Sequence, residues 1–495
     1  MFLRNSFSVV LLAERKDLMT QMERKLILFF VVSLIFFVWY TTAVQAQKKS
    51  VVEEILDILL ANHQISEEQY QYLLKKAKAE EQERTQGSTT KTISQKESLK
   101  ENREVSRSGE KRYNETRINT YWKDGLHFET DDNRFSITIG GKIHYDWGYI
   151  NEDADVGKFV GEDFGSGSKM RRARLFVKGN VYDNIDFKAE YGFSGGEVKV
   201  KDLYLGMKNI PFLGTLRIGH TKEPFSLEEL TCGSDVTFME RSLPNAIVPR
   251  RNIGFLAHNF AFDKRLSWSV GVFSETDSKG NGFGENDRYN LTGRLSFLPW
   301  YRDNGKDLLY VGASYSHKFM DDGTEERYRA RPESHLTDTH FLDTGNIPTD
   351  DIDLCDAELA LVLNSFSIQS EYVRTFLNPS SGDRMHFDGF YVYGSYFLTG
   401  EHRHYAENKE AFGHVKPRRN FQITGSGWGA LEAAFRYSYL DLDDEEIHGG
   451  IMNEYTVGLN WYLNPHSRLM FNFIHSHLNN IGDTDIFQSR FQLDF

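Results

Sequence analysis

The sequence contains little cysteine and, after residue 41, no long hydrophobic run. Two of its 495 residues are cysteines, so Cys232 and Cys355 either form a single disulfide or remain free thiols. No apolar stretch after residue 41 is long enough to cross a bilayer as a helix, which excludes a helical membrane protein in that part of the chain. A β-barrel is not excluded, because only alternate residues of its strands face lipid.

Proline is scarce and positive charge is not in excess. The 10 prolines stand beside 40 glycines and 14% aromatic residues, a composition that suits short strands with tight turns. The 58 Lys and Arg residues are outnumbered by 71 Asp and Glu residues. Without residues 1–46, the balance becomes 53 basic against 68 acidic residues. We therefore expect no nucleic-acid partner.

The N-terminus has the pattern of a secretory signal peptide. Arg24 and Lys25 precede an apolar run over 26–40, and small residues follow up to Ala46. This order predicts that 1–46 is a signal peptide, with a spurious extension over 1–21. A membrane anchor is the alternative, but fifteen apolar residues are short for a span.

Two further segments precede the strands. Residues 47–85 are predicted to form a periplasmic helical segment like a short coiled coil, because apolar residues recur at helical spacing. It could self-associate, contact a periplasmic partner or remain a solvated tail. Residues 86–130 are predicted to be a flexible linker, because 83–115 is rich in charged and hydroxyl residues and nearly free of apolar ones.

From residue 131 to 495 the hydrophobic pattern has a period of two. Over 135–149, apolar side chains occupy odd positions and polar ones lie between them, as in a strand with one lipid-facing side. About sixteen such segments follow one another. They predict an all-β fold, an antiparallel transmembrane β-barrel of about sixteen strands with an aqueous channel. We expect the long loops 222–250, 321–353 and 400–426 on one side and the short turns on the other.

The chain ends on an alternating strand. Phe491, Leu493 and Phe495 lie at two-residue spacing up to the last residue. This pattern is similar to the signal that the barrel-assembly machinery recognises in outer-membrane proteins. The alternative is a strand that simply ends there. We expect the mature chain to lie in outer-membrane lipid.

Several short motifs occur in a fixed order along the barrel region. They are MRRARL at 170–175, GHTKEPFSLE at 219–228, FMERS at 238–242, PRRNIG at 249–254, LTGE at 398–401, AFRYSYLDL at 434–442 and NWYLNP at 460–465. Together they resemble the phosphate-selective porin O and P family over roughly 130–495. The resemblance implies a sixteen-stranded barrel, a homotrimer, a loop folded into the pore, and small anions such as phosphate or polyphosphate as permeants.

Basic residues on the predicted second strand and inward loop are the candidate anion-binding residues. A guanidinium group offers paired donors that match a tetrahedral oxyanion. The same loop carries several carboxylates, so these cations could instead form structural ion pairs in a general, weakly selective porin. The candidates are Arg172, Arg174, Lys178, Lys222, Arg241, Arg250 and Arg251.

Enzymatic function has little support in the sequence. The pairs His402/His404 and His475/His477 each lie on one strand face, but neither has a third metal ligand at convincing spacing. No nucleophile motif is found. We therefore expect no catalytic residue, no metal and no cofactor. A barrel enzyme or a structural tether built on the N-terminal helices are the less favoured alternatives.

Overall fold

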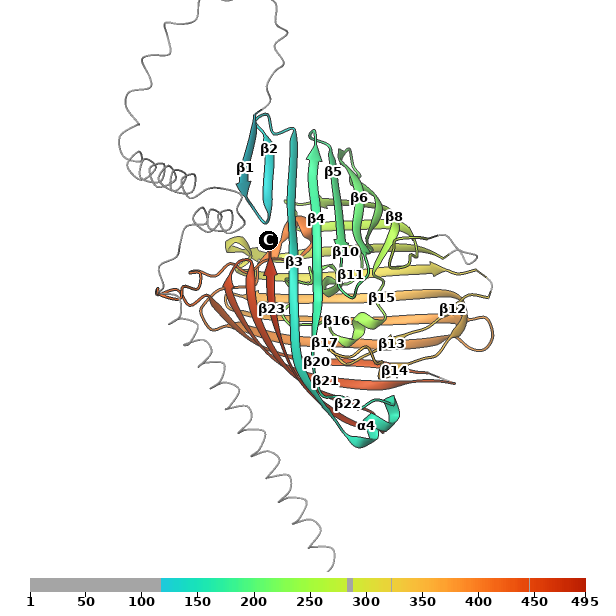
Figure 1. The fold of residues 1–495 in the computed structure, drawn as a ribbon. Helices are drawn as coiled ribbons and strands as arrows, with labels where there is room; N and C mark the ends of the chain where they lie inside the picture. Colours follow the sequence, from blue (N-terminus) through green and yellow to red (C-terminus); the bar gives the residue numbers. More distant parts are fainter. Residues whose placement is uncertain (1–116, 283–287, 322, 445) are drawn as a thin grey trace, which may run out of the picture. The chain divides into compact units, whose positions relative to one another are not determined.

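The computed structural model describes residues 117–282, 288–321, 323–444 and 446–495. The predicted signal peptide, the helical segment and most of the linker lie outside these residues. Sixteen antiparallel strands form a closed barrel, which confirms the predicted fold class (Figure 1). The ring closes because the last strand pairs with the first, with Asp494 opposite Lys142.

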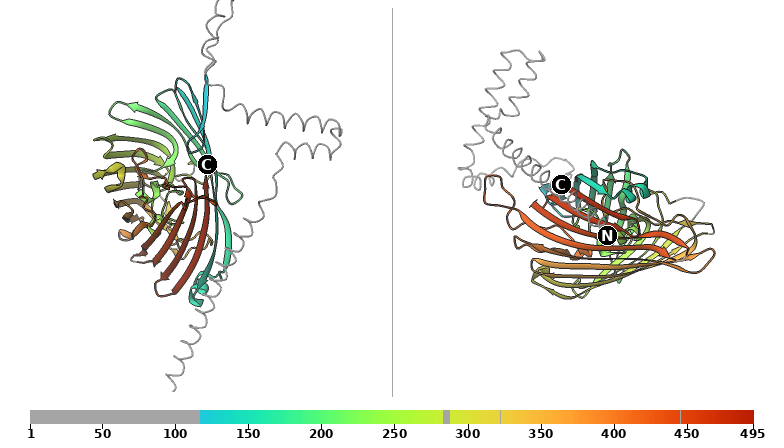
Figure 2. Two further views of the ribbon diagram at one scale, coloured as in Figure 1. Left: turned by 90° about the vertical axis from the view of Figure 1, so that its left-hand side faces the viewer. Right: turned by 90° about the horizontal axis from the view of Figure 1, so that it is seen from below.

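Each barrel strand pairs with its neighbours along the chain. In order they are β3 (Phe135–Glu152), β4 (Ser166–Val181), β5 (Ile185–Gly192), β6 (Lys199–Ile210), β7 (Gly214–Lys222), β8 (Arg251–Ala261), β9 (Leu266–Ser274), β10 (Tyr289–Arg302), β11 (Asp307–Phe319), β15 (Ile347–Leu363), β16 (Phe366–Pro379), β17 (Met385–Phe397), β20 (Ala430–Asp444), β21 (Ile447–Asn464), β22 (Ser467–Leu478) and β23 (Gly482–Asp494). Figure 2 shows these strands curving around a central space in two further views.

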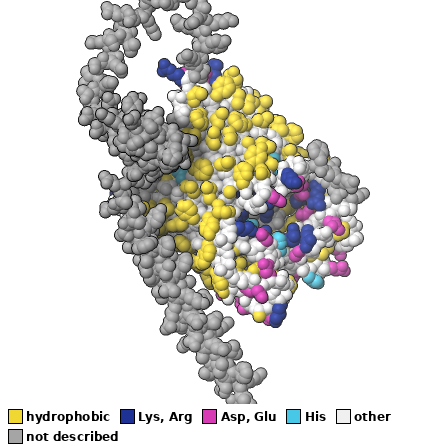
Figure 3. All heavy atoms as spheres, viewed as in Figure 1, with side chains coloured by type: hydrophobic (Ala, Val, Ile, Leu, Met, Phe, Trp, Pro, Cys, Tyr) yellow, Lys and Arg dark blue, Asp and Glu magenta, His cyan; other side chains and the backbone are white. Residues whose placement is uncertain are grey.

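The two faces of the strands are inverted relative to a soluble protein. On β3, Ile139 and Tyr145 are exposed outward, whereas His144 and Asp146 are buried inside. Figure 3 shows hydrophobic side chains over much of the barrel surface. An outer face of this kind suits lipid and a polar interior suits a channel. The helices of the described residues are all too short or too polar to cross a membrane.

A hairpin precedes the barrel within the range predicted as linker. It consists of β1 (Ile118–Trp122) and β2 (Leu126–Thr130), and β2 pairs with the start of β3. Along β3, the last strand β23 pairs only with residues 142–152, and Phe495 exchanges two backbone hydrogen bonds with Gly141. The hairpin therefore pairs with the part of the β3 edge that β23 leaves open. The composition of 86–130 alone does not reveal this pairing.

Three long connections fold into the barrel. The first, 223–250, contains α5 (Leu227–Leu230) and η1 (Leu243–Ala246), and we call it the inward loop. The second, 320–346, contains β12 (Glu325–Glu326), β13 (Arg329–Ala330) and β14 (Leu342–Asp343). The third, 398–429, contains β18 (Tyr405–Ala406), η3 (Glu407–Lys409) and β19 (Ala411–Phe412). Elsewhere, α4 (Ala154–Val160) follows β3 and η2 (Asp303–Gly305) precedes β11.

The prediction that all long loops share one side is wrong for 400–426. Successive connections alternate between the two ends of the barrel, and 398–429 falls at the end that carries the short turns. Its length reflects packing inside the barrel: Tyr405, Ala411 and Phe412 are buried against Leu308 and Tyr310. The apolar core therefore lies in the lumen, where it holds the inward segments against the wall.

Candidate pore constriction

The inward loop begins with a short capped turn. Ser226 accepts a hydrogen bond from the backbone N–H of Glu229 at 3.1 Å, which satisfies a free donor at the start of α5. Phe225 and Leu227 are fully buried on either side of this cap. The local sequence therefore fixes where the chain turns away from the wall and enters the lumen.

Wall arginines hold the middle of this loop by its carbonyl groups. Arg172 Nη1 donates to the oxygen of Gly233 at 3.0 Å, and Arg468 Nη1 donates to the oxygen of Val236 at 2.9 Å. Arg436 and Arg490 donate to the carbonyls of the two residues that follow Phe238. All four arginines are at most 4% exposed. Arginines from four strands therefore hold the loop by hydrogen bonds to its backbone carbonyls as well as by ion pairs with carboxylates.

Several acidic side chains of the inward loop face cations of the wall, whereas Glu223 is bonded to Asn252, Asn290 and Thr292. Glu240 lies 2.7 Å from Arg171 and 2.6 Å from Arg490, and Glu228 lies 3.3 Å from Arg436. These pairs offset the negative charge that the sequence places in the loop.

Glu229 is paired with one cation at the end of β7 and one in the loop. It lies 3.2 Å from Lys222 and 3.3 Å from Arg241. Burial alone would raise the pKa of Glu229, but Arg241 and Lys222 hold it below its ordinary value. Arg241 also donates to the backbone oxygens of Glu228, Glu229 and Thr231, so it staples the loop to itself.

The remaining predicted anion-binding residues divide into paired and unpaired groups. Arg174 lies 3.1 Å from Glu190, and Arg251 lies 2.7 Å from Asp202. Lys178 lies over the ring of Phe176. Among the described residues, no carboxylate lies within ion-pair distance of Lys178 or of Arg250, whose side chain is exposed.

A patch of positive charge lies where these residues meet. Lys201, at a register shift between β5 and β6, is repelled by Arg171, Arg174 and Arg251. Arg250 has Arg171 as a neighbour too. We call Arg171, Arg174, Lys201, Arg250 and Arg251 the basic patch. Figure 3 shows Lys and Arg side chains, with some acidic ones, gathered at a hollow beside the hydrophobic surface.

The inward loop also carries a thiol. Sγ of Cys232 lies 3.1 Å from Nζ of Lys142 on β3. Burial raises the pKa of Cys232, but the Lys142 ammonium outweighs that effect and lowers it to about 6. Both cysteines are free thiols in the structure, with Cys355 on the outer face of β15.

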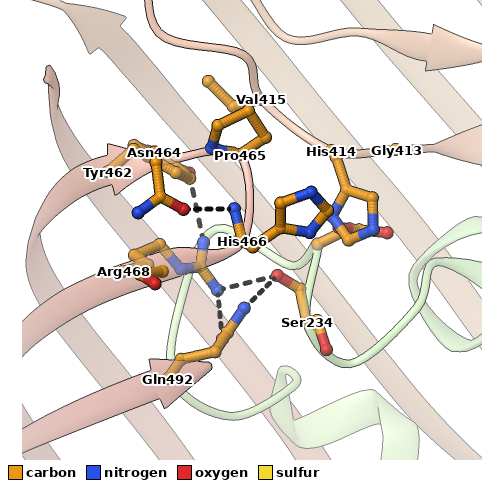
Figure 4. Close-up of a pocket in the computed structure, with 12 residues that line it drawn as sticks. Ser234, Gly413, His414, Val415, Tyr462, Asn464, Pro465, His466, Arg468 and Gln492 are labelled. Atoms are coloured by element: carbon orange, nitrogen blue, oxygen red, sulfur yellow. Dashed lines mark hydrogen bonds and ion pairs between the residues drawn. The ribbon is translucent and has the colours of Figure 1, made fainter. Parts of the chain in front are cut away.

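The third inward segment meets the inward loop inside the barrel. His414 Nδ1 lies 2.7 Å from Asp235, and Arg403 donates to Gln369 at 2.9 Å while covering the ring of Phe412. Figure 4 shows the small pocket at this junction, where His414 and His466 lie near Arg468, and Arg468 reaches Ser234 and Gln492. Segments from both ends of the barrel therefore narrow the same lumen.

The histidine pairs singled out in the sequence do not gather metal ligands in the described residues. His475 and His477 lie 2.8 and 2.6 Å from Asp485 and Asp483 on the outer face. Two other groups in the described ranges place three ligand atoms within 4.8 Å of one another. They are His317, Asp351 and Asp353, and Asp356, Glu358 and Glu371.

Sequence reasoning missed Lys142, Lys201, Arg436, Arg468 and Arg490. Arg436, Arg468 and Arg490 stand at even positions of strands whose odd positions carry the outward apolar residues. Listing the polar face of every strand, rather than that of the second strand alone, would have found these three. Lys201 lies beside a register shift, where the period of two gives no guide.

Known proteins resemble the chain along the barrel. The family model described as phosphate-selective porin O and P matches residues 137–495. An uncharacterized protein of Caulobacter vibrioides is 30% identical over 366 residues, covering 71% of this chain and 70% of that protein. Porin O of Pseudomonas aeruginosa is 24% identical over 412 residues, covering 73% and 89%.

A solved structure is also similar to the chain. The outer membrane channel DcaP of Acinetobacter baumannii aligns with 74% of this chain and 99% of its own, with a TM-score of 0.47 and 10% identity. The family match covers most of the chain and includes every barrel strand except the first two residues of β3. The chain therefore belongs to the phosphate-selective porin O and P family and is an outer-membrane porin for the diffusion of small solutes.

Proposed function

We propose that the pore prefers anions and passes phosphate-like oxyanions. The observation that supports this most directly is the unpaired positive charge in the basic patch. The carboxylates of the inward loop at positions 228, 229, 235 and 240 each lie beside a basic side chain. Lys201 and Arg250 in the basic patch have no such partner among the described residues. A passing ion therefore meets positive charge that the wall has not neutralised.

Charge of this kind acts strongly in a narrow pore. Low-dielectric walls focus the field of a few groups, so they can outweigh the acidic average of the whole chain. The guanidinium of Arg250 offers paired donors to a tetrahedral oxyanion, and the ammonium of Lys201 offers a point charge. Such a site must also release the ion to allow conduction, which favours few and partly solvated contacts.

A general, weakly selective porin is the second candidate. It is favoured by the number of predicted anion-binding residues that already hold protein groups. Arg172 and Arg241 bind loop carbonyls, and Arg174 and Arg251 pair with wall carboxylates. In that case, the arginines stabilise the barrel and its inward loop, and the width of the pore selects solutes by size.

Reversal potentials in a KCl gradient separate the two candidates. Purified protein in planar bilayers should prefer chloride, and added phosphate should reduce the chloride current. Changing Arg250 and Lys201 together to Gln should shift the reversal potential toward cations and weaken the phosphate effect. The matched control is Lys158→Gln, because Lys158 is an exposed residue of α4 paired with Asp155. A double variant indistinguishable from the wild type would leave the general porin as the function.

Further features of the protein belong to the same proposal. The family resemblance supports a homotrimer in outer-membrane lipid with the N-terminal segment in the periplasm, acting as a channel rather than an enzyme. The terminal alternation of Phe491, Leu493 and Phe495 supports insertion by the barrel-assembly machinery.

Deleting Phe495 should remove the signal for this machinery and leave unfolded protein in the periplasm. Normal amounts of heat-modifiable barrel from the truncated chain would contradict that role.

A further inference from the structure

Three carboxyl groups are buried together in the barrel wall behind α5. Asp356 and Glu358 lie on β15, and Glu371 lies directly opposite Glu358 on β16. None is more than 4% exposed, and one oxygen of each lies within 4.8 Å of the others. Like charges placed opposite each other on paired strands are destabilising. The cluster therefore needs a compensating positive charge.

The wall supplies one guanidinium, and it is shared. Arg294 donates to both oxygens of Glu358 at 2.8 Å and lies 3.4 Å from Glu410. In the described part of the chain, no basic side chain lies within ion-pair distance of Asp356 or Glu371. Arg294 thus fixes Glu358 as a carboxylate and leaves the other two uncompensated.

The hydrogen bonds of Glu371 reach only one of its two carboxyl oxygens. Its Oε1 accepts the backbone N–H of Glu228 at 2.8 Å and the hydroxyl of Tyr391. These two donors satisfy Oε1. Its other oxygen, Oε2, and Oδ1 of Asp356 have no hydrogen-bond partner among the described residues, although both side chains are buried. Such atoms are costly unless something binds them.

We propose that Asp356, Glu358 and Glu371 bind a calcium ion in the barrel wall. The donors are all oxygens, as a hard divalent cation requires, and they include no nitrogen or sulfur to favour zinc. The two unpartnered oxygens are its first ligands, and water completes the coordination shell. Because Glu371 also accepts the N–H of Glu228, the ion braces the inward loop from the wall side. A second ion of the same class, magnesium, competes for this site.

Terbium luminescence tests the site directly. Tb³⁺ replaces Ca²⁺ and is sensitised by nearby tyrosines, and the hydroxyls of Tyr310 and Tyr391 both bond to cluster carboxylates. Folded protein in chloride buffer without phosphate should give Tb³⁺ emission that Ca²⁺ displaces. Saturating Ca²⁺, at roughly 100-fold its dissociation constant, should raise the midpoint temperature of barrel unfolding by about 3 °C.

Variants assign the ion to the cluster. Asp356→Asn and Glu371→Gln should each abolish the displaceable emission and the thermal shift. Asp351→Asn, in the other ligand group, should retain both. If neither variant folds, the wild type alone decides: absence of displaceable emission overturns the proposal. Wild-type protein that ignores Ca²⁺ but gains stability as the pH falls would show that a shared proton, not a cation, compensates the carboxylates.

Discussion

Two groups of arginines in this barrel differ in what they contact. On β20, β22 and β23, Arg436, Arg468 and Arg490 are at most 2% exposed and hold the inward loop by its carbonyls. In the basic patch, Arg250 is exposed and has no carboxylate partner among the described residues. The residue type is the same in both places. The partner, not the residue, decides whether an arginine holds the inward loop or keeps its charge unpaired.

The largest effect is expected where a buried anchor is removed. Arg490 donates to both carboxylate oxygens of Asp146 at 2.7 Å and to Glu240 at 2.6 Å. Arg490→Gln leaves the buried carboxylate of Asp146 without its cation and leaves Glu240 with Arg171 as its arginine partner, so we expect a loss of about 3–5 kcal/mol in unfolding free energy. Conductance should rise because the loop is released. Arg250→Gln is the control and should unfold like the wild type.

If Arg490→Gln and Arg250→Gln were equally stable, the proposed difference between buried arginines that hold the loop and unpaired arginines would be wrong. Heat-modifiability on gels measures the stability, and single-channel recording measures the conductance. The two readouts together separate a loosened loop from a misfolded barrel, because an intact barrel still conducts.

Lys142 is a third kind of lumenal cation, because its partner is the sulfur of Cys232. The reactivity of that thiol tests the pairing. Its pKa of about 6 means that the reactive thiolate increases as the pH rises through 6 and is nearly complete above pH 7. In a Cys355→Ser background, the rate of modification by a thiol reagent should rise roughly tenfold from pH 5 to pH 7, as expected for a group titrating near 6. Lys142→Met should move that rise to higher pH. A rise centred near the ordinary thiol value in the unchanged protein would contradict the pairing.

A smaller effect is expected for single free cations. Arg250→Gln removes one charge from a solvated lumen, where a charge about 8 Å from the ion is worth roughly 0.5 kcal/mol. The ratio of chloride to potassium permeability should therefore fall about twofold, measured as reversal potential. The effect should shrink in concentrated salt because the charge is screened. A ratio that is unchanged at low salt would place Arg250 outside the ion path.

The smallest effect is expected on the outer face. Leu175 on β4 is 51% exposed to the surroundings of the barrel, next to inward Arg174. Leu175→Ala should cost at most about 1 kcal/mol of stability and leave selectivity unchanged, since the side chain keeps half its surface outside the wall. A changed reversal potential in this variant would show that β4 is turned the other way.

The regular part of this fold could be predicted from the sequence. Alternation over 135–149 located β3 almost to its ends, and the closed barrel followed from sixteen such segments. The end of the barrel on which 398–429 lies could not be predicted, because it depends on counting every strand before it. The contacts between wall arginines and the inward loop could not be predicted either. Spacing turned Arg172 inward, but its partner, the carbonyl of Gly233, lies 61 residues away.

The seam between β3 and β23 has a consequence for how the barrel forms. Backbone partners across it include Trp147 and Ser489, which are 342 positions apart in the chain. Bringing such distant segments together carries a large chain-entropy cost, so contacts of this kind form late and slowly. The wall cannot become continuous until β23 has been delivered. During that delay β2 already covers the first part of β3, which shortens the open edge that could pair with another chain.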